Sequence, residues 1–152
     1  MTVGTGASSA AGRPAPWADR TGRGLMAFDA LATLVAFADG VLRMGDVPDD
    51  RLLTEAWRTF AYLVFTGLWA ILATAPRRQP GLWELVLLHK IVFTAFAFTM
   101  IGDVPEAQTT GLIDLGLVVT TALAYVLCRG WYAWRTTAPE PASDGRPARS
   151  ER

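Results

Sequence analysis

Ionisable side chains lie inside stretches of this chain that are otherwise apolar, and these residues could do chemistry. Asp29, Lys90, His89 and Tyr125 supply a carboxyl, an ammonium, an imidazole and a phenol. Such groups exchange protons or bind the polar part of a ligand. Within a membrane they usually face the interior of a bundle or a cavity. We predict that the four residues form an inner layer that binds a ligand or couples to protons.

A second polar set lies towards the opposite ends of the same stretches. Its two acids and two bases can neutralise one another: Asp39, Asp114, Arg43 and Arg58. We predict that this outer layer mainly pairs and orients the helices. Counting depth at about 1.5 Å per residue places Lys90 within reach of Asp29, so these two are expected to pair. The pair could be a structural lock or part of a functional site, and the sequence leaves both open.

Several kinds of chemistry lack the residues they require. One histidine and one cysteine, His89 and Cys128, cannot build a multi-histidine metal site, a cysteine-ligated cluster or an intramolecular disulfide. No nucleotide-binding fingerprint or serine-histidine-aspartate arrangement is present. The net charge of zero argues against a nucleic-acid binder. We expect no metal, no cofactor and no complete catalytic set. Any catalysis would be acid–base work on a lipophilic substrate by the inner layer.

The elements that position these residues are four apolar stretches, at about 25–43, 58–75, 82–101 and 111–131. About 20 helical residues cross a hydrocarbon core of about 30 Å, and the runs lack the alternation of barrel strands. The short connections between them contain glycine and proline. We predict an all-α fold, an integral membrane four-helix bundle over residues 24–135. Residues 1–23 and 136–152 are poor in apolar residues and are expected to be disordered.

The distribution of arginine predicts the orientation of the bundle. Arginines flank both ends of the apolar region and the connection at 76–81, whereas the connections at 45–50 and 102–111 are mainly acidic. Cytoplasmic loops carry the excess of positive charge, so both termini are expected in the cytoplasm. Only one of the 14 cations is lysine, a composition typical of a GC-rich bacterial gene. The predicted location is the bacterial cytoplasmic (inner) membrane, as a multi-pass protein.

The third stretch opens with Trp83-Glu84 and carries His89-Lys90. With these residues, four spans and both termini expected in the cytoplasm, the chain resembles the DoxX-like group of small bacterial membrane proteins over residues 25–135. Some members of that group accompany redox or sulfur-oxidising enzymes as accessory subunits. The resemblance implies an accessory or binding role rather than an independent oxidoreductase. The expected partners are therefore the bilayer, a second membrane subunit or a small lipophilic ligand.

A second comparison is with the small multidrug resistance transporters, which have four helices, a buried acid in the first helix and a dimeric state. Asp29 could take the place of that acid, but those proteins are shorter and carry glutamate there. A buried Lys90 is also expected to repel cationic substrates. A homodimeric transporter coupled to protons through Asp29 is therefore the second hypothesis, after an accessory or lipophile-binding protein. A membrane-embedded acid–base enzyme is the third.

Overall fold

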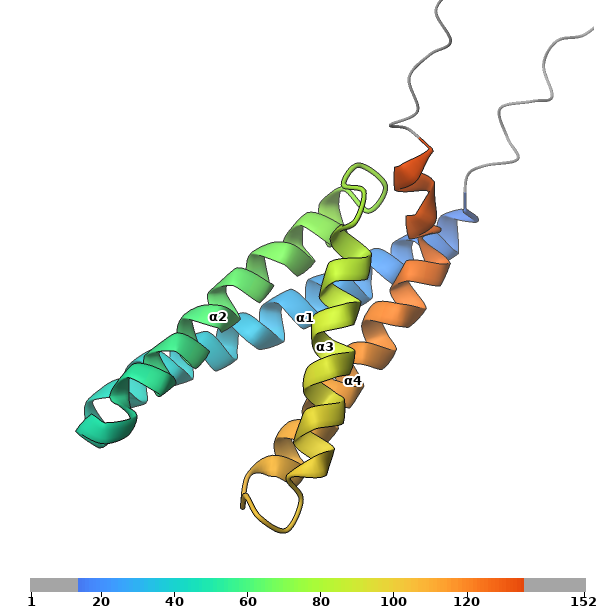
Figure 1. Ribbon diagram of the computed structural model, residues 1–152. Coiled ribbons are helices and arrows are strands. Elements are labelled where there is room, and N and C mark those ends of the chain that lie inside the picture. The colour runs from blue at the N-terminus through green and yellow to red at the C-terminus, as the bar shows by residue number, and fades with distance from the viewer. Residues whose placement is uncertain (1–13, 136–152) are drawn as a thin grey trace, which may run out of the picture.

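The computed structural model describes residues 14–135, and all regular structure in that range is helical. Four long helices are joined by short turns, with a short 3-10 helix after the first and another after the fourth (Figure 1). Their bounds are α1 (Pro16–Arg43), η1 (Met44–Asp46), α2 (Asp49–Thr74), α3 (Leu82–Thr99), α4 (Ala107–Leu127) and η2 (Gly130–Trp134). The predicted all-α four-helix fold is confirmed.

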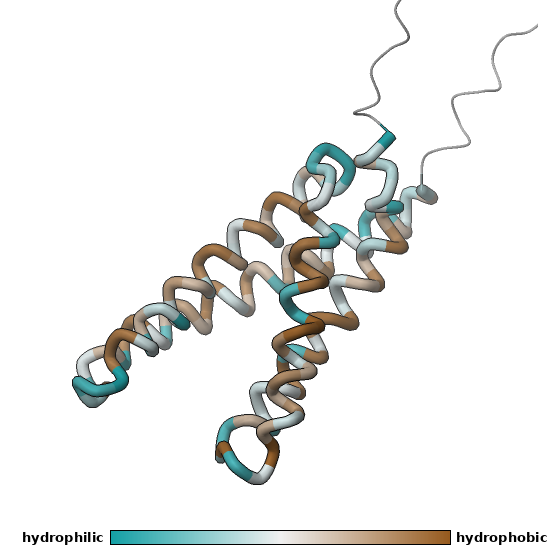
Figure 2. The backbone as a smooth tube through the Cα atoms, viewed as in Figure 1, coloured by the Kyte–Doolittle hydropathy of each residue, from teal (hydrophilic) through white to brown (hydrophobic). Residues whose placement is uncertain are grey.

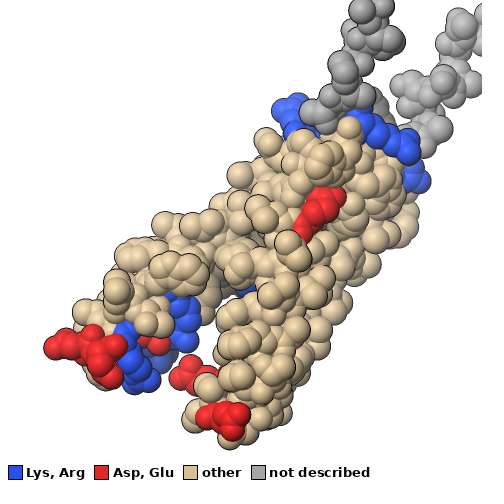
Figure 3. Space-filling model, viewed as in Figure 1, with Lys and Arg blue, Asp and Glu red and all other residues tan. Residues whose placement is uncertain are grey.

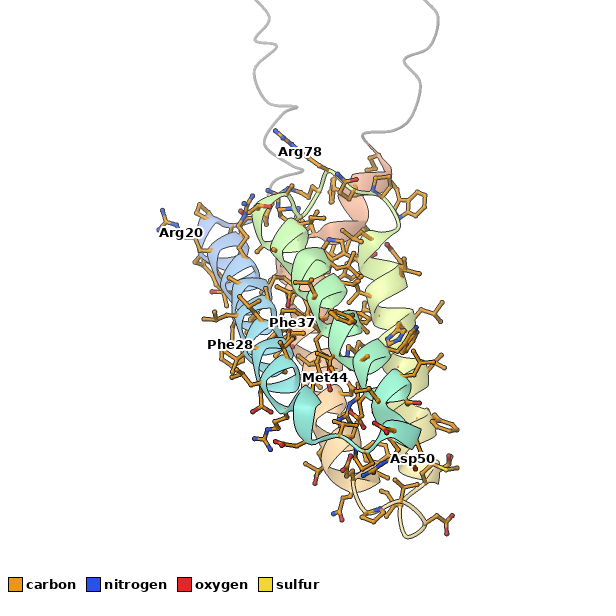
Figure 4. The ribbon with its side chains drawn as sticks, turned by 90° about the vertical axis from the view of Figure 1, so that its left-hand side faces the viewer. Arg20, Phe28, Phe37, Met44, Asp50 and Arg78 are labelled. Carbon is orange, nitrogen blue, oxygen red and sulfur yellow. The ribbon has the colours of Figure 1, made fainter. Side chains whose placement is uncertain are left out.

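Each long helix is long and apolar enough to cross a membrane. Figure 2 shows apolar residues along all four, with polar residues gathered at the turns. Large apolar side chains are exposed on the outside of the bundle: Leu42 is 83% exposed, Leu53 84% and Phe28 64%. Phe28 points away from the bundle in Figure 4. A water-soluble domain rarely exposes so much contiguous apolar surface. The chain is therefore a multi-pass membrane protein.

The helices form two antiparallel hairpins, α1 with α2 and α3 with α4, each packed along its length. Helix α1 also packs against α4, whereas α2 and α3 touch at few positions. The hairpins meet at the terminal end (residues 16–23, 75–84 and 128–135). They lean apart towards the hairpin end (residues 39–58 and 100–107), which gives the molecule the outline of a V (Figure 1).

The apolar core lies in the half of the bundle next to the terminal end. It is built around two tryptophans that are fully buried, Trp69 and Trp83. Their indole N–H groups are both satisfied, by the Thr121 hydroxyl at 3.1 Å and by the Pro76 carbonyl oxygen at 2.7 Å. A buried indole N–H without a partner would cost free energy, so these bonds fix the two rings in place. The terminal half is consequently closed.

The helix bounds correct some of the expectations from sequence. Helix α1 begins at Pro16, so residues 16–23 are helical and not disordered. Pro16 suits the first turn of a helix, and Arg23 pairs with Asp19 one turn away at 2.8 Å. Helix α2 likewise begins well before the apolar run at 58–75. The disorder expected for residues 1–13 and 136–152 lies outside the described residues.

Two glycines make the remaining turns possible. Gly81 precedes α3 and Gly102 lies in the turn after it, both with positive φ angles, of 83° and 98°. Residues other than glycine rarely adopt this conformation.

The fourth helix ends earlier than expected from the sequence. It stops at Leu127, and Arg129, with a φ of 51°, turns the chain into η2. The residues expected to form the fourth span, 111–131, therefore comprise most of α4 and the turn into η2.

Candidate ligand-binding cleft

A cleft opens at the hairpin end of the molecule, with a volume of about 670 Å³. Helix α1 contributes Ala36 and Gly40 to its wall, and α2 contributes Thr59 and Tyr62. Figure 3 shows the space between the two hairpins and the charged side chains around its mouth. Glu106, in the turn between α3 and α4, closes one side. All the other lining residues belong to the hairpin of α1 and α2, so the cleft lies on the side of that hairpin next to the turn between α3 and α4.

The charged residues of the mouth form ion pairs. Asp39 pairs with Arg43 at 2.8 Å within α1, and Glu55 pairs with Arg58 at 2.5 Å within α2. Arg58 also reaches Glu106 across the mouth at 3.6 Å. Asp39, Arg43 and Arg58 of the expected outer layer therefore all line the cleft, with Arg43 and Arg58 in separate ion pairs.

Asp114 does not belong to this outer layer. It accepts a hydrogen bond from the Lys90 ammonium at 2.5 Å, and both side chains are only 8% exposed. The expected pairing of Lys90 with Asp29 is therefore wrong. In an antiparallel hairpin, residues at similar distances from the turn lie at the same depth. Lys90 precedes the turn at 100–106 by about as many residues as Asp114 follows it.

Aromatic rings of α2 cover the buried ion pair. The Lys90 ammonium lies 4.6 Å from the Phe65 ring centroid and 5.6 Å from that of Trp69. A ring face attracts a cation most strongly where water is excluded. Thr94, one turn along α3 from Lys90, is buried and its hydroxyl has no partner. The pair thus joins α3 to α4 within one hairpin, and two rings of α2, from the other hairpin, pack over its ammonium.

Asp29 occupies a separate position between α1 and α4. Its side chain is fully buried, and one carboxylate oxygen accepts a hydrogen bond from the Thr120 hydroxyl at 2.8 Å. The other oxygen, Oδ1, has no partner. A buried carboxylate oxygen without a donor is costly, because it has lost its water and gained nothing. Among the acids of the described residues, Asp29 alone has a buried carboxylate oxygen without a partner.

The remaining inner-layer candidates do not join Asp29 or Lys90 by hydrogen bonds. His89 lies on the flank of α3, with its ring 4.7 Å from that of Phe65 and stacked on Phe93. The Tyr125 hydroxyl donates to Glu84 at 3.0 Å, near the terminal end. The structure thus distributes the predicted inner layer over several places and does not form one site from it. Depth along each helix was the only guide from sequence, and it does not specify which faces meet.

A polar clamp holds the terminal end closed. Asp19 accepts hydrogen bonds from Arg23 at 2.8 Å and from Arg77 at 2.5 Å. Arg77 also donates to the backbone oxygen of Cys128 at 2.9 Å, and Arg23 to that of Thr74. The clamp ties α1 to the α2–α3 turn and to the end of α4. The assignment of residues 1–23 to a disordered segment concealed it.

Sequence reasoning also missed the α2 wall of the cleft, although a signal was present. Arg51, Glu55, Arg58 and Tyr62 are spaced by three or four residues, the spacing of one helix face. Because the expected span began at residue 58, this face was divided between a loop and a helix. A helix extended back to the proline at residue 48 would have shown it whole.

Among residues 14–135, no group of three or more His, Cys, Asp or Glu side chains is close enough to hold a metal ion. Comparison of the chain with protein-family models, curated proteins and solved structures gives no match.

Proposed function

We propose that this protein binds a small amphiphilic molecule in the cleft between its two hairpins. The polar group of the ligand would lie among the charged and hydroxyl side chains of the cleft. Its apolar part would extend along the exposed aromatic and aliphatic flanks towards the lipid. The observation that carries the proposal is the asymmetry of the bundle, which has an open, charged cleft at the hairpin end and is closed by an apolar core and a polar clamp towards the terminal end. Ligand-binding sites in proteins are concave.

The orientation expected from sequence is part of the proposal. The terminal end carries six arginines and two carboxylates among the described residues, which favours the cytoplasmic side of a bacterial inner membrane. Arg20 and Arg78 point outwards there (Figure 4). The cleft would then open at the outer leaflet. Single cysteines introduced into the turns at 45–50 and 102–106 should label from outside intact cells, and labelling only after lysis would reverse the orientation.

Filling the cleft tests the binding proposal directly. Ala36 lines the cleft, whereas Val35 beside it on α1 is 63% exposed on the outside of the bundle. A photoactivatable long-chain alcohol should label cleft peptides of the wild-type protein in vesicles. Ala36→Phe should abolish that labelling, and Val35→Phe should leave it intact. Labelling of the wild type that is spread evenly over all four helices would overturn the proposal.

The accessory role implied by the DoxX-like resemblance remains compatible with a ligand site. Native mass spectrometry of gently solubilised protein would reveal a second kind of subunit or a bound lipophilic molecule. Either would support a binding or accessory role.

A proton-coupled transporter is the second candidate function, and Asp29 is the residue that favours it. Its buried carboxylate has one unpartnered oxygen, and the closed terminal half would have to open for transport. Asp29→Asn should then abolish substrate-driven proton movement in vesicles. Unchanged movement would exclude coupling through this residue.

A further inference from the structure

The described charges are strongly separated along the long axis of the molecule. The hairpin end carries seven carboxylates and only three arginines: Asp39, Asp46, Asp49, Asp50, Glu55, Asp103 and Glu106 against Arg43, Arg51 and Arg58. The terminal end has the opposite excess, and Figure 3 shows acidic side chains around the mouth of the cleft. A cleft with low-dielectric walls focuses such a field. The field attracts cations towards the cleft.

The ion pairs at the mouth leave carboxylates available to a ligand. Arg43 and Arg58 are each paired with a carboxylate of their own helix. Glu106 is 75% exposed and lies 3.6 Å from an arginine that Glu55 already neutralises. Asp46 lines the cleft and forms no ion pair among the described residues. Four carboxylates and three arginines line the cleft, so the lining has a net negative charge. Of the three arginines, Arg51 forms no such ion pair among the described residues.

The depth of the cleft offers hydroxyl groups and an aromatic face. Thr59 is only 3% exposed and lines the cleft beside Gly40, yet its hydroxyl has no hydrogen-bond partner within residues 14–135. Tyr62, on the same face of α2, likewise has no partner for its hydroxyl in the described part of the chain. Both hydroxyl-bearing residues line the cleft, so each hydroxyl can donate to or accept from a polar group bound there. The Tyr62 ring adds a face suited to a cation.

We propose that the ligand's head group is cationic, a protonated or quaternary amine received by Glu106 and Asp46 above Tyr62. This inference rests on the proposed function, because it names the ligand class of the same cleft. The sequence suggested that Lys90 would repel cations. The structure removes this objection, since Asp114 neutralises Lys90 at 2.5 Å.

Three photoactivatable probes with the same alkyl chain test the proposal, carrying a trimethylammonium, a hydroxyl or a sulfonate head group. The full chain is placed in vesicles of uncharged phospholipid, and labelling of cleft peptides is measured against probe concentration. The trimethylammonium probe should bind most tightly and the sulfonate probe least. The preference should shrink as salt is added, because salt screens exposed charges.

Glu106→Gln should weaken binding of the trimethylammonium probe about fivefold, the size of one exposed charge contact, and leave the hydroxyl probe within about twofold. Asp50→Asn is the matched control, since Asp50 lies at the same end (Figure 4) and does not line the cleft. That variant should change the binding of either probe by less than about twofold. Thermal unfolding of each variant checks that its fold is retained.

The outcomes separate this inference from the proposed function. Equal labelling by all three probes, abolished by Ala36→Phe, would overturn the cationic head group and retain the ligand site. A preference for trimethylammonium that persists in the double variant Asp46→Asn/Glu106→Gln would overturn the assignment of these carboxylates. Cleft labelling by none of the probes would overturn the proposed function and this inference together.

Discussion

The buried ion pair between Lys90 and Asp114 provides the sharpest test of how α3 and α4 are held together beneath the rings of α2. Replacing Lys90 by methionine keeps the apolar stem and removes the ammonium. Asp114, 8% exposed, would then lose its 2.5 Å partner. Leaving a buried charge unpaired costs about 3–5 kcal/mol. Loss of the contacts between the ammonium and the rings of Phe65 and Trp69 adds about 1 kcal/mol. We expect Lys90→Met to lower the free energy of unfolding by about 4–6 kcal/mol.

Equilibrium unfolding in detergent micelles measures this change, with helix content as the signal. The double variant Lys90→Met/Asp114→Leu should regain most of the loss, because apolar residues of similar volume often replace a buried pair without penalty. Arg43→Met is the control: it breaks a pair whose side chains are 74% and 55% exposed, and it should cost less than about 1 kcal/mol. If Lys90→Met costs no more than Arg43→Met, the pair does not hold the bundle in solution.

Three further predictions concern packing and reactivity. A β-carbon on Gly22 would lie 2.5 Å from the Cys128 sulfur, so Gly22→Ala should destabilise the folded protein by about 1–3 kcal/mol in thermal melts. Gly24→Ala is the control and should not destabilise it, because no atom lies within 4 Å of a β-carbon at that position. Burial, with a smaller contribution from the nearby Asp19 carboxylate, raises the pKa of the Cys128 thiol from 9.0 to about 11. Maleimide should therefore label the folded protein far more slowly than the unfolded protein. The free energy of unfolding should also decrease as pH rises above about 9, because the thiol of the unfolded chain ionises at a lower pH than the buried thiol. Equal maleimide labelling rates for the folded and the unfolded protein would refute the burial of this thiol. Trp69→Phe leaves the Thr121 hydroxyl unpaired and should cost about 2 kcal/mol of unfolding free energy, part of which Trp69→Phe/Thr121→Val regains.

The class of fold follows from the amino-acid sequence alone. Four apolar runs long enough to cross a membrane, separated by glycine and proline, leave few alternatives, since backbone groups in lipid must be satisfied within helices. The same reasoning located the polar faces of two helices. Helical periodicity puts Lys90, Thr94 and Ala97 on one face of α3. It puts Gly111, Asp114 and Thr121 on one face of α4, and all six residues are buried.

Helix ends were less predictable, because apolar runs mark where lipid begins and not where helices begin. Pro16 and the polar clamp around Asp19 extend α1 into a polar segment. The contacts that stabilise this extension come from Arg77 and the backbone of Cys128, which are distant in sequence. Only tertiary structure could supply them.

The pairing of side chains between helices depends on how the helices are rotated and packed in the folded protein. Periodicity defines the face of one helix, but it gives no rotation of that helix relative to its neighbours. Lys90 therefore meets Asp114 and not Asp29, whose carboxylate instead accepts a hydrogen bond from Thr120. The cleft has the same origin, since it exists because two hairpins that pack closely at one end separate at the other.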